Sequence, residues 1–101
     1  MPNIKFNYLY RDADNYKKFD SIIFENDQSI SIEELELLIK SKLIDSEWFY
    51  ADQWKVQEIF LDTFDYKIDP TWHEFESIEY SDEPTNSVFT LAEFVKTLKS
   101  L

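Results

Sequence analysis

The chain of 101 residues contains no glycine, and this absence limits the turns that it can form. Backbone positions with positive φ suit glycine best, and asparagine and aspartate are the next most tolerant residues. We therefore expect asparagine or aspartate at the tight turns, with Asn15, Asn26, Asp27, Asp45 and Asn86 as candidates. The glycine-rich loops that hold phosphates in Rossmann and P-loop proteins are excluded, and so is nucleotide binding by those routes.

Two segments near the start of the chain have the pattern of β-strands. Apolar residues alternate with polar ones over Ile4, Phe6, Tyr8 and Tyr10, which is typical of a strand with one buried face. Residues 19–25 (FDSIIFE) form a second apolar run. The polar link RDADNYKK between the two runs predicts an antiparallel hairpin with a long loop.

Residues 72–80 (WHEFESIEY) have the composition of a further strand. Simple alternation along it predicts that His73, Phe75 and Ser77 share one face. The other face would then carry Trp72, Glu74, Glu76, Ile78 and Tyr80. Residues 56–61 fit either a strand or a short helix.

Two capping boxes mark the starts of two helices. Ser31 with Glu34 precedes apolar residues at helical spacing and predicts a helix over residues 32–44. Thr90 with Glu93 precedes a second amphipathic helix at the C-terminus. Together the patterns predict one α+β domain over residues 1–101, with an antiparallel sheet of three or four strands and two helices packed on one face.

The negative charge is concentrated in residues 45–83, which hold twelve acidic residues and two basic ones. This segment therefore carries −10 of the net charge of −11, together with all three tryptophans and the single histidine. Such charge disfavours direct binding to nucleic acid and to anionic membranes, because both are bound through lysine and arginine. A basic protein surface, a cationic small molecule or no charge-driven partner remains, and a basic protein surface is the partner that we predict.

The overall composition predicts a folded cytoplasmic protein. Apolar residues make up 44% of the chain and aromatic residues 18%, which is more than disordered acidic tails contain. Cysteine is absent, which suits a reducing compartment and excludes disulfides and zinc–thiolate sites. The sequence has neither the pattern of a signal peptide nor 18 consecutive apolar residues, so we expect no membrane association.

Aromatic and acidic residues alternate within the acidic segment, and this mixture suits a cationic partner. Ring faces attract cations, carboxylates supply charge, and aromatic residues are enriched as anchors of protein interfaces. For most of these rings, however, burial in the core of the small domain is the favoured interpretation. The binding residues predicted on this basis are Trp48, Tyr50, Asp52, Trp54, Asp62, Asp65, Asp69, Glu74, Glu76 and Glu79.

No metal or cofactor site is predicted. Asp62, Asp65, Asp69 and His73 recur at helical spacing, but Pro70 interrupts the helix that would align them. The spacing of an EF-hand is also missing. His73 has neighbouring carboxylates but no evident nucleophile or metal, so a structural or surface histidine is the favoured interpretation.

Two stretches resemble motifs of a group of short bacterial proteins that are uncharacterised. Residues 10–17 (YRDADNYK) are similar to the Y-R-D-A-x-N-Y-K of that group, where glycine often stands in the place of Asp14. Residues 72–85 (WHEFESIEYSDEPT) are similar to its W-H-E-F…E…E-P-T segment. The resemblance implies no activity, but it points to Arg11, Asp12, Asn15 and Lys17 in the predicted hairpin loop.

Three hypotheses follow from the sequence. The favoured one is an acidic, non-enzymatic protein-binding module, for example an inhibitor, immunity or antitoxin-like protein acting on a basic partner that handles nucleic acid. The alternative is a small enzyme or ligand-binding domain that uses Arg11, Asp12, His73 and Glu74. A structural or dimerisation module is the third. Arg11 has a structural interpretation as well, namely an ion pair with the acidic segment of its own chain.

Overall fold

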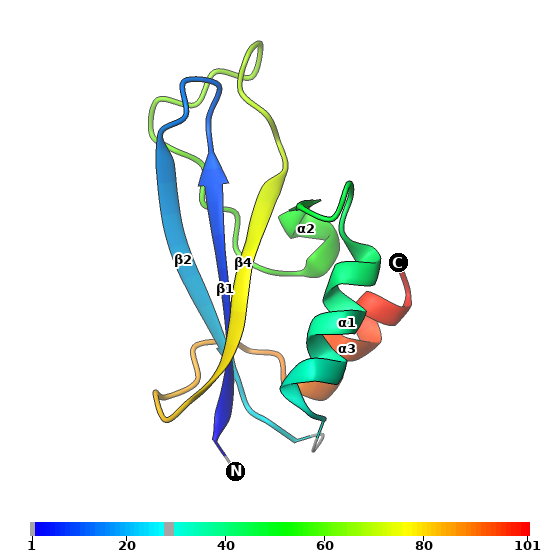
Figure 1. The fold of residues 1–101 in the computed structure, drawn as a ribbon. Helices are drawn as coiled ribbons and strands as arrows, with labels where there is room; N and C mark the ends of the chain where they lie inside the picture. Colours follow the sequence, from blue (N-terminus) through cyan, green and yellow to red (C-terminus); the bar gives the residue numbers. More distant parts are fainter. Residues whose placement is uncertain (1, 28–29) are drawn as a thin grey trace.

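The protein is built on one antiparallel sheet of four strands in the order β2-β1-β4-β3 (Figure 1). The computed structural model describes residues 2–27 and 30–101. Its strands are β1 (Asn3–Arg11), β2 (Lys17–Phe24), β3 (Trp48–Phe49) and β4 (His73–Ser81). β1 and β2 form the predicted antiparallel hairpin, with residues 12–16 as its loop. The sheet is long and curled, and the molecule measures 42 × 26 × 20 Å.

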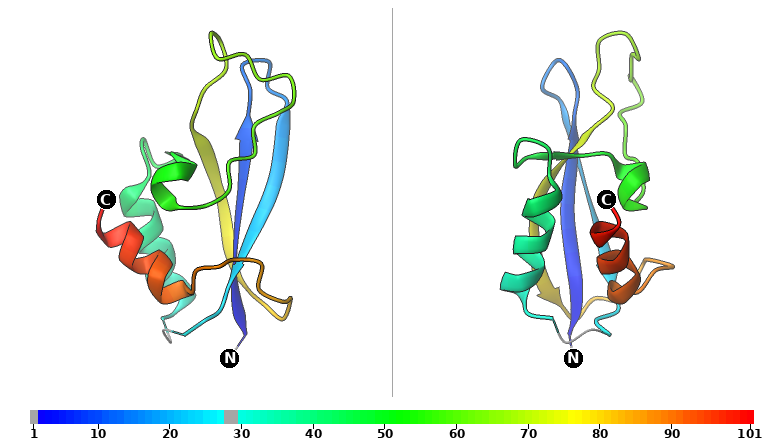
Figure 2. Two further views of the ribbon diagram at one scale, coloured as in Figure 1. Left: turned by 180° about the vertical axis from the view of Figure 1, so that it is seen from behind. Right: turned by 90° about the vertical axis from the view of Figure 1, so that its right-hand side faces the viewer.

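The helices lie together on one face of this sheet, as the two further views show (Figure 2). They are α1 (Ile32–Lys42), the short α2 (Ala51–Trp54) and α3 (Leu91–Lys99). The predicted α+β fold with two helices on one face is therefore confirmed, and α2 is an addition that the sequence did not predict. The capping box at Thr90 is complete, whereas at Ser31 the described residues show only one of its two bonds, in which the Ser31 side chain accepts from the backbone N–H of Glu34.

The core lies between the helices and the covered face of the sheet. Ile4, Phe6, Tyr8 and Tyr10 of β1 alternate toward it, and none of them is more than 1% exposed. The Phe6 ring contacts five other aromatic rings at centroid distances of 5.5 to 6.1 Å. Residues 56–61 form neither strand nor helix, but Val56 and Ile59 are buried in the same cluster. Burial of these large rings is the main favourable contribution to folding.

A β-bulge interrupts the pairing of β1 with β4. Asn7 lies opposite Ser77, whereas the next residue, Tyr8, lies opposite Phe75, so that Glu76 is an extra residue on β4. Residues directly opposite each other share a face of the sheet. Ser77 therefore lies with Asn7 on the face away from the helices.

The bulge overturns the face assignment predicted for residues 72–80. Ile78 and Tyr80 were expected beside Glu74, but they lie on the same face as Phe75, and Tyr80 is opposite the buried Ile4. One extra residue reverses the alternation of every residue that follows it. The predicted strand is correct, and its alternation is wrong beyond the bulge.

The turns avoid glycine by placing other residues at positive φ. Asn15 has φ of 68° and Asp45 has φ of 51°, as the sequence predicted. Ser46 at 62° and Lys55 at 58° were not predicted, and the other predicted residues, Asn26, Asp27 and Asn86, do not have positive φ. The turn at residues 45 and 46 follows α1 closely, so α1 ends at Lys42 rather than at residue 44.

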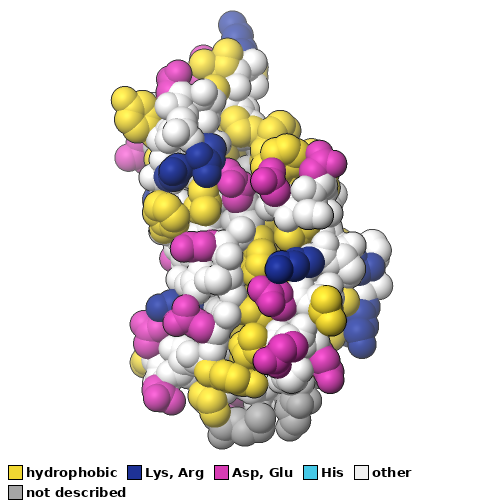
Figure 3. Space-filling model, viewed as in Figure 1, with side chains coloured by type: hydrophobic (Ala, Val, Ile, Leu, Met, Phe, Trp, Pro, Cys, Tyr) yellow, Lys and Arg dark blue, Asp and Glu magenta, His cyan; other side chains and the backbone are white. Residues whose placement is uncertain are grey.

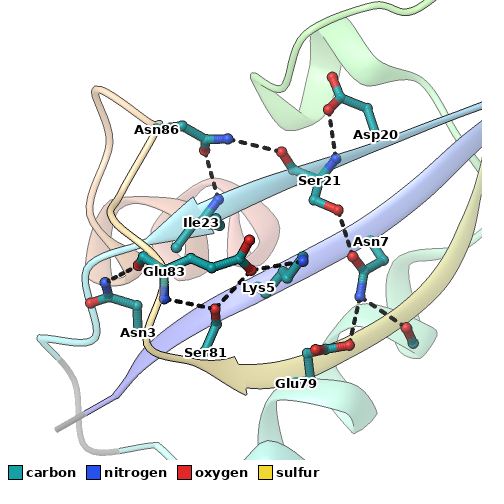
Figure 4. Close-up of polar contacts among 11 residues, drawn as sticks. Asn3, Lys5, Asn7, Asp20, Ser21, Ile23, Glu79, Ser81, Glu83 and Asn86 are labelled. Carbon is teal, nitrogen blue, oxygen red and sulfur yellow. Dashed lines mark hydrogen bonds and ion pairs between the residues drawn. The ribbon is translucent and has the colours of Figure 1, made fainter.

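The face of the sheet that points away from the helices is called the uncovered face. In its half near the N-terminus it carries polar side chains (Figure 4). The Asn7 amide is central, because it accepts from Ser21 Oγ at 2.6 Å and donates to Ser77 Oγ at 3.1 Å. It also donates to Glu79 Oε2 at 3.2 Å. These bonds link β2, β1 and β4 through side chains, so this half of the face is satisfied within the chain.

Asn86 protects the free edge of β2 (Figure 4). Its Oδ1 accepts from the Ile23 backbone N–H at 2.7 Å, and its Nδ2 donates to the Ser21 carbonyl at 3.1 Å. Its own backbone N–H donates to the Ile23 carbonyl at 3.2 Å. Pairing these groups within the chain removes part of an open sheet edge that other chains would otherwise pair with.

Candidate functional site

Two loops meet at the end of the sheet that lies far from the N-terminus (Figure 1). One is the hairpin loop of residues 12–16, and the other is the long connection of residues 62–72 that leads into β4. The hairpin loop lies within residues 10–17, the first of the two segments that resemble motifs. The long connection ends at residue 72, where the second such segment, residues 72–85, begins. The fold therefore brings the first motif and the start of the second, which are distant in sequence, to one end of the molecule.

Asp12 holds the hairpin loop in shape. Its carboxylate Oδ1 accepts from the backbone N–H of Asp14 at 3.0 Å and of Tyr16 at 2.8 Å. Asp12 is buried, with only 8% of its surface exposed. Carboxylates that accept such bonds close turns in place of a backbone group. The role of Asp12 is thus to shape the loop.

Asp69 ties the two loops together. Its Oδ1 accepts from the Ala13 backbone N–H at 3.0 Å, and its Oδ2 accepts from the Asp65 backbone N–H at 2.7 Å. The Tyr10 hydroxyl adds a second link by donating to the Pro70 carbonyl at 2.6 Å. Hydrogen bonds to an ionised carboxylate are among the stronger ones in proteins. They fix the loops relative to the sheet.

Below the loops, the uncovered face of the sheet carries one row of larger side chains. Phe19 lies opposite Leu9, Leu9 opposite Glu74, and Glu74 opposite Trp48, so the row crosses all four strands. Leu9 is only 8% exposed even though it faces away from the helices, whereas Phe19 is 59% exposed. Apart from Glu74, this row is apolar and aromatic, in contrast to the polar half of the face around Asn7.

Arg11 and Glu74 form an ion pair beside this row. Arg11 Nε donates to Glu74 Oε2 at 2.7 Å, and Nη2 lies 3.4 Å from Oε1. Arg11 Nη1 donates to Asn15 Oδ1. The hydrogen bond to Glu74 is the main cause that raises the pKa of the Arg11 guanidinium, and the charge of Glu47 adds to it. Arg11 therefore pairs with the acidic segment of its own chain, through Glu74, as its structural interpretation predicts.

A groove of about 510 Å³ opens between the loops and the row. The Trp48 and Trp72 rings lie along it with centroids 5.6 Å apart, and Trp72 is 38% exposed. The groove is lined by Arg11, Asp12, Ala13, Trp48, Lys67, Ile68, Asp69, Pro70, Thr71, Trp72 and Glu74. Concave sites with aromatic walls and a few polar groups are typical binding sites.

His73 lies outside the groove, on the covered face of the sheet. It is 0% exposed, and its ring centroid lies 5.2 Å from that of Tyr10 and 5.3 Å from that of Phe60. Its Nε2 accepts from the Ile59 backbone N–H at 3.0 Å, so the neutral ring carries its proton on Nδ1. Burial lowers the pKa of His73 to about 4, although the charge of Asp52 acts in the opposite direction.

The four residues of the enzymatic hypothesis are therefore not brought together. Arg11, Asp12 and Glu74 line the groove, but His73 points to the opposite face, because neighbouring residues of a strand point to opposite sides. Nδ1 of His73 has no hydrogen-bond partner among the described residues, and the imidazole ring lies among aromatic rings. A buried, neutral histidine of this kind acts as a core residue.

The predicted binding residues divide into three groups. Trp48, Asp69 and Glu74 line the groove. Trp54 is 2% exposed and belongs to the core, so its place among the binding residues was wrong. The others lie on the surface away from the groove, half-buried for Tyr50 and exposed for Asp52, Asp62, Asp65, Glu76 and Glu79.

The sequence prediction did not include Trp72, which lines the groove. Its position directly before His73 in the WHEF motif was the available signal. The ring lies in the groove because Trp72 directly precedes β4 and packs beside Trp48 of the neighbouring strand β3, with the two rings tilted by 44°. That contact depends on the pairing of β3 with β4, which a single sequence does not reveal.

The acidic segment keeps most of its charge free. Ten of its twelve acids are exposed and two, Asp69 and Glu74, are half-buried. Among the described residues, only Glu74 and Glu83 of this set form ion pairs, with Arg11 and Lys5. Figure 3 shows acidic side chains spread over the whole visible face, with few basic ones among them. On this face the acidic side chains therefore form no single patch.

Comparisons with known proteins add no family to this description, since family models, curated sequences and solved structures all give no match. In the part of the chain that the structure describes, no helix has the length and apolar character needed to cross a membrane. Among the same residues, no group of three or more histidine, aspartate or glutamate side chains is arranged to hold a metal ion.

Proposed function

We propose that this chain is an acidic, non-enzymatic protein-binding domain that docks onto a basic surface of another protein. The observation that carries the proposal is the unneutralised charge of residues 45–83, where ten of the twelve acids have no ion-pair partner among the described residues. A field of one sign attracts a partner of the opposite sign and speeds association.

The groove supplies the anchor for this interaction. Three exposed apolar side chains lie in the two loops around it, with Tyr16 69%, Tyr66 80% and Ile68 63% exposed. Exposed apolar groups gathered at one place mark interaction sites, and tryptophan, tyrosine and arginine dominate the binding energy of known interfaces. The groove contains two tryptophans and an arginine.

The partner class that suits this surface is a protein that handles nucleic acid, because such proteins present basic channels for phosphates. The corresponding role is that of an inhibitor, immunity or antitoxin-like protein in the cytoplasm. The enzymatic alternative is not carried further, because His73 lies in the core, away from Arg11, Asp12 and Glu74.

Neutralising acids within the acidic segment is expected to weaken partner binding more than neutralising the same number elsewhere. The test variant replaces Glu47, Glu58 and Glu76 by glutamine, and all three side chains are exposed. The matched control replaces Glu33, Glu34 and Glu36 of α1, so that each variant has a net charge of −8 instead of −11. Basic proteins retained from host lysate at low salt are compared among the three proteins.

The result expected is a basic protein that the wild type and the α1 variant retain at low salt, that high salt releases, and that the segment variant retains several-fold less. Equal loss in both variants would show that only total charge matters. That result, or retention that ignores salt, contradicts the proposal.

A further inference from the structure

We propose that the groove beside Trp48 and Trp72 receives an arginine side chain of the basic partner. The inference rests on the proposed function, because it assumes that the partner is basic. It goes further by assigning the chemical group that is bound and the residues that bind it. The relevant features are the two tryptophan rings, the state of Arg11 and the carboxylates around them.

The hydrogen bonds that the Arg11 guanidinium already makes disfavour an anionic ligand in this groove. All three guanidinium nitrogens already have acceptors within the chain, since Nε and Nη2 face Glu74 and Nη1 donates to Asn15. A phosphate or carboxylate ligand would have to compete with the Glu74 carboxylate for the same donors. Three acids, Asp12, Asp69 and Glu74, line the groove against two bases, Arg11 and Lys67.

The carboxylates leave acceptor capacity for an incoming cation. Glu74 Oε1 has only the long 3.4 Å contact to Arg11. Glu47 is exposed, lies next to Trp48 in the sequence and makes no ion pair among the described residues, and its field reaches Arg11. A carboxylate oxygen accepts more than one hydrogen bond. An arginine from the partner can therefore be paired without breaking the Arg11–Glu74 pair.

The tryptophan rings favour arginine over lysine. The Trp72 ring is partly exposed, and it lies beside the Trp48 ring at 5.6 Å. A planar guanidinium stacks on such a ring and is more weakly hydrated than the ammonium group of lysine. The neighbouring Ile68, 63% exposed, offers apolar surface for the methylene groups of the arginine stem.

The test follows the three indole N–H signals of the full chain while N-acetyl-arginine methylamide is added. Trp48 and Trp72 lie in the groove, whereas Trp54 is buried in the core and serves as an internal reference. We expect the signals of Trp48 and Trp72 to move and that of Trp54 to stay. N-acetyl-lysine methylamide should bind several-fold more weakly.

Two variants make the test specific. Trp72→Leu is expected to weaken arginine binding roughly three- to tenfold, which is the range of one cation–π contact. Tyr80→Leu is the matched control, because Tyr80 is an exposed aromatic residue, 49% exposed, at the other end of β4. It should bind like the wild type. An unchanged Trp54 signal in both variants reports that the core is intact.

Three results would overturn the inference: no movement of the groove signals, equal movement with lysine, or equal weakening by both variants. None of these results contradicts the proposed function. That function is tested by comparing the acidic-segment variant with the α1 variant, and Trp72 is unchanged in both. A basic partner that depends on Glu47, Glu58 and Glu76 while arginine leaves the groove signals unmoved supports the function and refutes this binding site.

Discussion

The Trp54→Ala variant is expected to lose about 3 to 5 kcal/mol of unfolding free energy, as large-to-small changes of buried tryptophan do. Trp54 is 2% exposed, and its ring lies 4.6 Å from Phe49, 6.1 Å from Phe6 and 6.2 Å from Phe94 by centroid distance. These neighbours belong to β3, β1 and α3. The helices and the sheet do not collapse fully around the missing ring, so the loss includes a cavity.

Trp72→Leu provides the control for this prediction, because both tryptophans belong to the same acidic segment. Trp72 is 38% exposed, and we expect its replacement to cost about 1 kcal/mol or less, as for most surface positions. Urea denaturation followed by circular dichroism measures both variants. Equal losses would contradict the assignment of Trp54 to the core and Trp72 to the groove.

Lowering the pH from about 6.5 to 4 is expected to destabilise the protein through His73, by up to about 3 kcal/mol. Burial lowers the pKa of His73 in the folded chain to about 4, whereas the unfolded chain has the ordinary value near 6.5. The unfolded state therefore binds the proton first. The contribution of the neutral ring is complete above pH 6.5 and is lost as the pH falls toward 4.

His73→Gln separates this effect from the titration of the carboxylates. The glutamine side-chain oxygen can accept from the Ile59 N–H, as His73 Nε2 does at 3.0 Å, but it does not titrate. The variant should be less stable at pH 7, and its unfolding free energy should change less between pH 6.5 and 4 than that of the wild type. Parallel pH profiles for the two proteins would show that His73 does not titrate in this range.

The fold could be predicted from the sequence where local patterns agree with tertiary packing. Alternation over β1 and the capping boxes at Ser31 and Thr90 predict their elements because short-range contacts decide them. The faces of β4 could not be predicted beyond Glu76, since the bulge depends on pairing with β1. Lys55 at positive φ ends the short α2, and lysine carries no local signal for that conformation.

Single residues of the candidate site could be predicted from the sequence, but the groove that they form could not. The two motifs indicated Arg11 and Glu74, and the excess of acids around Arg11 indicated that it pairs within the chain. The groove itself depends on Asp69 tying two loops together and on β3 bringing Trp48 beside Trp72. Such contacts join residues far apart in sequence. No periodicity in a single chain records them.

We expect the partner to bind at the half of the uncovered sheet face that carries the row from Phe19 to Trp48, and to leave the polar half around Asn7 free. Hydrogen exchange of the chain, alone and bound to the basic partner retained at low salt, measures this directly. We expect slower exchange in the complex over residues 10–17, 47–48 and 66–74, which surround the groove. Residues 77–86, satisfied within the chain around Asn7 and Asn86, should exchange at unchanged rates. Slowing confined to residues 77–86 or to α1 would contradict binding at the groove.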